Sequence, residues 1–188
     1  MHSSRAFPRL LPLFLVVGAC QSSSSKIDGL YVDLENEVRH ADPIHLPSAN
    51  ADELHRQRAD AVRTALDEGG VTSADAMFKA SVMLVDTSRI EDLDLAESLG
   101  RKSADLGEPR GLRVVAEAVD KRAMLEGKTQ KYGTQYVFDW VLDSWRLYPV
   151  DIATTDAERA QMGVPTYAEL LHAEDEMNRA QKKNLRPR

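Results

Sequence analysis

The sequence predicts a mainly α-helical fold made of stacked antiparallel helix pairs, followed by a C-terminal β-hairpin and terminal helices. Between residues 50 and 127 apolar residues recur at helical spacing, and glycines close successive segments. After residue 133 the hydrophobic period changes to two, which is typical of strands. Two further capping patterns then indicate a short helix and a longer one. About 160 residues follow position 27, which suits one domain.

The first predicted helix pair begins with a capping pattern at Asn50 and continues to residue 85. Glycines at 69–70 end its first helix, as glycine at the position after a helix commonly does. A capping pattern at Thr72 starts the second helix, in which residues 76–85 are apolar on nearly every side. A helix that is apolar all round is a buried one, so this helix should form the core.

The second predicted pair repeats this arrangement. Ser88 begins its first helix, and Gly107 ends it 38 residues after Gly69. The acidic cluster at 91–97 then lies where negative charge complements a helix N-terminus. Pro109 fits the first turn of the last helix, which ends at Gly127.

A repeat length in the thirties with paired helices is typical of solenoid proteins. The rhythm of alanines and glycines in residues 93–119 is similar to Sel1-like repeats, which are related to tetratricopeptide repeats. Two such units are fewer than the roughly three that a free-standing solenoid needs. An ordinary helical bundle is an equally good interpretation of the same pattern.

The C-terminal third is predicted to form a hairpin and two helices. Residues 134–140 alternate in polarity, Asp143-Ser144 supplies a turn, and 145–148 return, so that both tryptophans belong to the hairpin. A lone hairpin is marginally stable, so we expect it to pack on the helices and cover one end of the stack. Capping boxes at Thr155 and Thr166 start the last two helices, and residues 181–188 form a basic tail.

The N-terminal residues 1–19 have the pattern of a secretory signal, with two arginines before an apolar stretch too short to span a bilayer. The sequence Val-Gly-Ala-Cys at 17–20 resembles the lipobox of bacterial lipoproteins, which implies that Cys20 becomes the lipidated first residue. A soluble secreted protein is the alternative. Residues 20–26 then form the lipidated cysteine and a serine-rich flexible tether, and residues 27–49 an irregular segment.

This resemblance implies an exported chain whose globular part faces the periplasm. Gln21 stands after the cysteine instead of aspartate, which in a host resembling enteric bacteria favours the outer membrane. Removal of residues 1–19 deletes two arginines and takes the formal net charge from −6 to −8. Such an acidic globule is a poor candidate for nucleic acid or anionic lipid, so we expect the anchor at Cys20 to be the membrane contact.

The sequence carries no recognised fingerprint of a common hydrolase or nucleotide-binding protein. We expect no cofactor. His40 and His45 flank a proline-containing loop, and a nearby carboxylate would let them bind zinc, but no recognised ligand pattern exists and scattered surface histidines are the better interpretation. His172 lies on the last predicted helix without a nucleophile at a recognised spacing.

One polar cluster stands out, at the end of the fourth predicted helix. Its core is Lys-Tyr-Gly-Thr-Gln at 131–135, preceded by Asp120 and Lys121. Glycine there permits a sharp corner, and the amides, phenol and hydroxyl offer hydrogen bonds for a polar ligand such as a peptide or glycan fragment. The same groups would equally satisfy the free carbonyls of a helix end. The candidate residues are Asp120, Lys121, Gln130, Tyr132, Gly133, Thr134, Gln135 and Arg159.

This cluster and the segment 156–165 resemble an uncharacterised bacterial family of unknown function, over roughly residues 90–175. Lys121 stands where members of that family have arginine, which weakens any bidentate binding of an anion. Thr129 replaces a common proline. The resemblance implies a fold and no reaction. We therefore expect a non-enzymatic binding or scaffold lipoprotein, with a small-ligand receptor or enzyme centred on residues 131–135 as the alternative.

Overall fold

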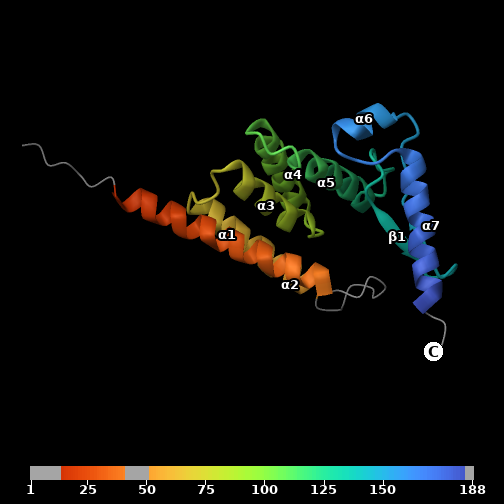
Figure 1. Ribbon diagram of the computed structural model, residues 1–188, viewed down its shortest axis with the longest axis horizontal. Coiled ribbons are helices and arrows are strands. Elements are labelled where there is room, and N and C mark those ends of the chain that lie inside the picture. Colours follow the sequence, from red (N-terminus) through yellow and green to blue (C-terminus); the bar gives the residue numbers. More distant parts are fainter. Residues whose placement is uncertain (1–13, 41–50, 185–188) are drawn as a thin grey trace, which may run out of the picture.

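The computed structural model describes residues 14–40 and 51–184, and it confirms a mainly helical chain with a small C-terminal hairpin (Figure 1). A predicted cap at Asn50, the first part of the signal sequence and residues 185–188 of the tail lie outside the described residues. The elements are α1 (Phe14–His40), α2 (Ala51–Asp67), α3 (Ala74–Val85), α4 (Ile90–Asp105), α5 (Gly111–Leu125), β1 (Tyr136–Asp139), β2 (Ser144–Leu147), α6 (Asp156–Gln161) and α7 (Tyr167–Asn184).

Helix α1 is the main departure from the sequence-based expectation. The segment 27–49 was expected to be irregular and 20–26 to be a flexible tether, yet the helix runs through both as far as His40. Its apolar side chains fall at helical spacing and pack against the core of the other helices, which stabilises helix over coil. These side chains are Ile27, Leu30, Tyr31 and Leu34.

Helix α3 lies at the centre of the helical stack, in contact with α1, α2, α4 and α5. Its buried side chains include Phe78, Met83 and Leu84, so the prediction that this helix forms the core is confirmed. The starting residues of two helices were predicted wrongly. Ser73, and not Thr72, caps α3 by accepting a hydrogen bond from the amide of Ala76. Helix α4 begins after Arg89, which makes no side-chain cap, and not at Ser88.

Helices α4 and α5 approach each other closely at two glycines. A Cβ atom added to Gly111 would lie 2.3 Å from the carbonyl oxygen of Gly100, and one added to Gly100 would lie 2.7 Å from the carbonyl oxygen of Gly111. Any larger residue at either position would therefore force the backbones apart. This close contact sets the position of α5 relative to α4. It therefore also sets where the C-terminal end of α5 lies.

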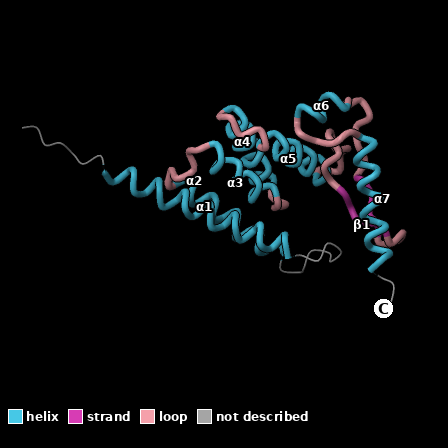
Figure 2. The backbone as a smooth tube through the Cα atoms, in the orientation of Figure 1, coloured by secondary structure: helices cyan, strands magenta, loops and turns pink. Residues whose placement is uncertain are grey.

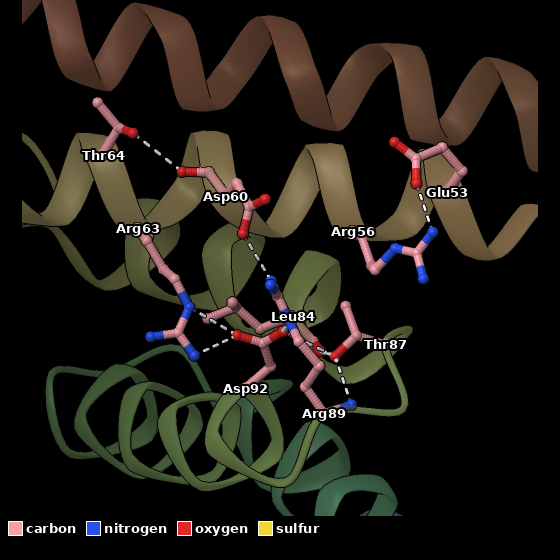
Figure 3. Close-up of polar contacts among 9 residues, drawn as sticks. All are labelled: Glu53, Arg56, Asp60, Arg63, Thr64, Leu84, Thr87, Arg89 and Asp92. Carbon is pink, nitrogen blue, oxygen red and sulfur yellow. Dashed lines mark hydrogen bonds and ion pairs between the residues drawn. The ribbon is translucent and has the colours of Figure 1, made fainter.

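A buried carboxylate joins α2 to the start of α4 (Figure 3). Asp92 is fully buried and accepts hydrogen bonds from Arg63 Nε at 2.7 Å, Arg89 Nε at 2.5 Å and Thr87 Oγ1 at 3.0 Å. Arg89 continues to Asp60 of α2 at 2.7 Å. Asp92 therefore does more than complement the helix N-terminus, because it holds two helices together through paired charges.

The hairpin forms a two-stranded antiparallel sheet in which Tyr136 pairs with Leu147 and Phe138 with Trp145. Figure 2 shows it beside α7, at the end of the molecule opposite the start of α1. Its main helical contact is with α7, so the expectation that it would cover one end of the helix stack is wrong. Trp140 lies in the connecting loop and not in a strand.

The predicted capping boxes of the last two helices are confirmed. Thr155 and Glu158 exchange side-chain and backbone hydrogen bonds at the start of α6. Thr166 and Glu169 do the same at the start of α7. Helix α7 continues to Asn184, so the first residues of the predicted basic tail are helical and its Gln181 is buried.

Candidate functional site

The polar cluster lies where the chain leaves α5 and turns towards the hairpin. Gly127 ends the helix with a φ of 71°, in agreement with the predicted stop. Gln130 then pairs with Val150 in an isolated parallel bridge, in which its amide donates to Pro149 O at 2.9 Å and its carbonyl accepts from Asp151 N at 2.8 Å. The corner is thereby joined to the chain that follows the hairpin.

Asp120 is the centre of the corner. Its fully buried carboxylate accepts hydrogen bonds from four consecutive backbone amides, at 2.7 Å and 2.9 Å to Oδ1 and at 2.9 Å twice to Oδ2. The donors are the amides of Lys131, Tyr132, Gly133 and Thr134. The Thr134 hydroxyl adds a fifth bond at 3.0 Å. Successive amides that converge in this way form an anion-binding concavity. Here the anion is the protein's own carboxylate.

Gln130 fills the other half of the corner and is also fully buried. Its side-chain amide donates to the carbonyls of Gln135 at 3.0 Å and Tyr148 at 2.8 Å. Its side-chain oxygen accepts from the backbone amide of Gln135 at 2.8 Å. A buried amide needs such partners, because an unpaired polar group costs free energy. The Gln130 side chain therefore links the corner to the backbone at the end of the hairpin.

Gly133 is required at its position for two reasons. Its φ of 95° lies in the left-handed region, and an added Cβ would lie 2.5 Å from Leu170 Cδ1. Leu170 belongs to a small second core with Ala116 and Val164, against which Tyr132 also packs. The glycine thus allows α7 to pack directly onto the corner.

Arg159 of α6 packs against the corner and donates a hydrogen bond to its backbone. It is 3% exposed, and its Nε donates to the carbonyl of Tyr132 at 3.0 Å. Its Nη1 donates to Thr154 O at 2.8 Å and to Asp156 at 3.1 Å. Arg159 does not pair with Asp120, because the hydrogen bonds that Asp120 accepts within the described chain come from residues 131–134. The guanidinium instead satisfies backbone carbonyls.

Lys121 does not belong to the corner, although it follows Asp120 directly. Its Nζ donates to the carbonyls of Val85 at 2.9 Å and Asp86 at 2.8 Å, so it caps the C-terminal end of α3. Burial lowers the pKa of Lys121 from its ordinary value, and Asp86 opposes this effect. Burial likewise raises the pKa of Asp86, against the neighbouring charges of His55 and Lys121.

The structure therefore brings together seven of the eight sequence-based candidates and places Lys121 elsewhere. Sequence reasoning missed Tyr148, Thr154 and Leu170, which supply two carbonyls and an apolar contact. All three come from segments that follow the cluster in the chain, and no local pattern marks them.

Within the described residues, no helix is long and apolar enough to cross a membrane. The same residues contain no cluster of three or more potential metal ligands, although the side chains of His40 and His45 are not described.

Comparison with known protein families, curated proteins and solved structures finds no match to this chain. The resemblances to a lipobox, to Sel1-like repeats and to a family of unknown function remain sequence-based predictions.

Proposed function

We propose that the chain is a lipid-anchored, periplasm-facing helical lipoprotein that acts as a binding or scaffold module at the outer membrane. The anchor rests on the sequence Val-Gly-Ala-Cys at 17–20, preceded by an apolar stretch and two arginines. Cys20 is also the chain's single cysteine, so it has no partner for an internal disulfide.

The observation that favours a binding or scaffold role over catalysis is the hydrogen bonding of Asp120. A general acid or base must be able to reach a proton of the substrate. An anion-binding concavity of backbone amides must likewise be open if it is to hold the anion of a ligand. The Asp120 carboxylate is fully buried, and five donors of its own chain surround it. The side-chain amide of Gln130, and Nε and Nη1 of Arg159, likewise donate to backbone carbonyls. The polar cluster that stands out in the sequence therefore stabilises the fold through hydrogen bonds within the chain.

The anchor is tested by the change Cys20→Ser in cells that produce the full chain. We expect the wild-type protein in the outer-membrane fraction and the variant in the soluble periplasmic fraction or as unprocessed precursor. A Ser22→Ala variant, changed in the adjacent serine run, is the matched control. Labelling with an alkyne fatty acid should mark the wild type and not Cys20→Ser. Equal labelling of both proteins, or equal retention of both in the outer membrane, would refute the anchor.

A small-ligand receptor is the second candidate, and a specific cavity favours it. About 290 Å³ of space lies beside Arg159, lined by Val150, Ile152, Thr154 and Tyr167 among others. This volume lies just below the usual range of about 300–1,000 Å³ for small-ligand sites, so the ligand would be small. Arg159 would contact an anionic group of such a ligand. Screening the purified chain against small carboxylates and phosphates by thermal shift tests this candidate, and no rise in melting temperature with any of them would contradict it.

A further inference from the structure

The hairpin loop presents three consecutive large apolar side chains to solvent. Trp140 is 72% exposed, Val141 93% and Leu142 59%. Single exposed apolar residues are common on proteins, but a contiguous group marks an interaction surface. We define residues 140–142 as the hairpin tip.

The hairpin tip is built rigidly. Asp139 Oδ1 accepts hydrogen bonds from the amides of Val141 at 2.9 Å and Leu142 at 3.0 Å, which fixes the backbone of the loop. The Trp140 ring lies edge-on to Phe138 with ring centres 4.9 Å apart. These contacts restrain the loop backbone while its apolar side chains remain outside, which reduces the backbone entropy lost when they are covered.

Helix α7 carries positive charge to this tip. Three side chains on one face of α7 follow β2 towards the loop: Glu174 accepts from Leu147 N at 2.6 Å, Asn178 from Trp145 N at 2.7 Å, and Gln181 donates to Asp143 at 3.2 Å. The C-terminal end of α7 thus lies at the base of the tip, as Figure 1 shows. The exposed cations there are Arg146, Arg179, Lys182 and Lys183.

Two carboxylates, those of Asp139 and Asp143, also lie at the tip. Asp139 is engaged by two amides and faces Arg146 Nη1 at 3.8 Å, and Asp143 accepts from Gln181. The acidic residues of α7 at 174–176 precede Asn178 and so lie farther from the loop. Lys182 and Lys183 follow Gln181 directly, so these two exposed lysines lie beside the apolar tip.

We propose that the hairpin tip inserts into an anionic phospholipid surface, as a second membrane contact distant from Cys20. An indole with adjacent aliphatic side chains suits the interface between headgroups and acyl chains. Lysines and arginines beside it are attracted to anionic headgroups. This inference rests on the proposed function in so far as the anchor supplies the nearby membrane. Cys20 belongs to the first turns of α1, whose start lies at the end of the molecule opposite β1 and α7 (Figure 1), so together the two contacts would restrict rotation of the chain about its anchor.

The test uses Trp140 as a reporter. The full chain with Trp145→Phe retains Trp140 as its single tryptophan, since the sequence has two. The protein is reconstituted in vesicles of phosphatidylethanolamine and phosphatidylglycerol that contain a brominated phospholipid. We expect a blue-shifted Trp140 emission that the bromine quenches, with weaker quenching in pure phosphatidylcholine or at high salt.

Matched variants separate the apolar and the charged contributions. Val141→Ser with Leu142→Ser should greatly reduce quenching, whereas Ile152→Ser, at a 95% exposed position outside the tip, should not. Lys182→Gln with Lys183→Gln should lower the ratio of inserted to free tip about fivefold per lysine, because a lysine near an anionic surface contributes about 1 kcal/mol. Lys128→Gln, another exposed lysine, should leave the ratio unchanged. Thermal melting checks that each variant folds.

Three results would overturn the inference. The first is a solvent-exposed, unquenched Trp140 in the anionic vesicles. The second is quenching that does not differ between anionic and phosphatidylcholine vesicles. The third is a photo-crosslinker at position 141 that labels a protein and not lipid in intact cells, because the tip would then be a protein-docking site. The Cys20 fractionation experiment does not report on Trp140, so either proposal can fail alone.

Discussion

Oδ2 of Asp120 accepts a hydrogen bond of 2.9 Å from the backbone amide of Gly133, across the exit of α5. The carboxylate projects from the helix, and the chain beyond the helix wraps around it. Because the amides of Lys131 to Thr134 all point at this one group, the corner depends on a single side chain. Removing the carboxylate should therefore leave several buried donors without partners.

Asp120→Ala should lower the free energy of unfolding by about 3 kcal/mol or more, since each unpaired buried donor costs about 1–3 kcal/mol. Urea denaturation followed by circular dichroism measures this. Asp139→Ala is the matched control, because Asp139 also accepts two backbone amides, but those of the exposed loop residues Val141 and Leu142, and it should cost below about 1 kcal/mol. Equal losses in the two variants would contradict the central role of Asp120.

Acetate or formate should partly restore the stability of Asp120→Ala. The variant leaves an empty concavity of four amides that suits a small carboxylate. We expect the melting temperature of the variant, and not of the wild type, to rise with acetate more than with chloride at equal ionic strength. The same rise in both proteins would show a general salt effect and no rescue.

Gly133→Ala should destabilise the protein more than Gly69→Ala. Both glycines have positive φ, so each alanine costs about 1–2 kcal/mol of backbone strain. A Cβ at Gly69 meets nothing within 4 Å, whereas one at Gly133 meets Leu170 at 2.5 Å, which should add about 1–3 kcal/mol. The difference between the two variants in urea unfolding isolates this contact. No difference would mean that Leu170 moves aside freely.

Asp92→Ala should lower the free energy of unfolding by about 1–3 kcal/mol, because it removes the buried acceptor that Arg63, Arg89 and the Thr87 hydroxyl share. Asp94→Ala, on the same helix, removes a carboxylate whose side chain is 57% exposed and which pairs with Arg122. That change should cost about 0–1 kcal/mol. Both values come from the same urea titration, and an equal cost would show that the buried network contributes little.

Asp86→Asn should stabilise the protein increasingly as the pH rises above about 4. Burial raises the pKa of Asp86 above its ordinary value of 3.8, while His55, Lys121 and Arg58 oppose the rise and Glu117 adds to it. A raised pKa in the folded state means that the favourable contribution is complete below the unfolded pKa and is lost as the pH rises through the folded pKa. At higher pH the wild type therefore retains a partly buried charge that the variant lacks.

Urea titrations of both proteins between pH 3 and pH 7 measure this effect. The gain in Asp86→Asn should be smallest at the acid end and increase with pH. The exposed acid Asp67, replaced by asparagine, provides a control for a general charge effect. A gain that is constant across the pH range would contradict the raised pKa.

The sequence determined most of the helical part by itself. Glycines at 69, 107 and 127 end helices where predicted, since a left-handed residue after the last turn is a local requirement. The capping boxes at Thr155 and Thr166 are equally local. The helical spacing of apolar residues from Ile27 to Leu34 was present in the sequence too, and an N-terminal helix could have been predicted from it.

Tertiary structure decided what the polar residues do. Asp120 and Lys121 are neighbours in the sequence, yet Asp120 binds the amides beyond α5 and Lys121 caps α3. Adjacent residues on a helix project about 100° apart, so their partners depend on what packs on each side. The contact between Gly133 and Leu170, and the course of α7 along β2, join residues far apart in the chain. Local spacing determines where helices begin and end, whereas the pairing of buried polar groups is fixed only when the elements pack.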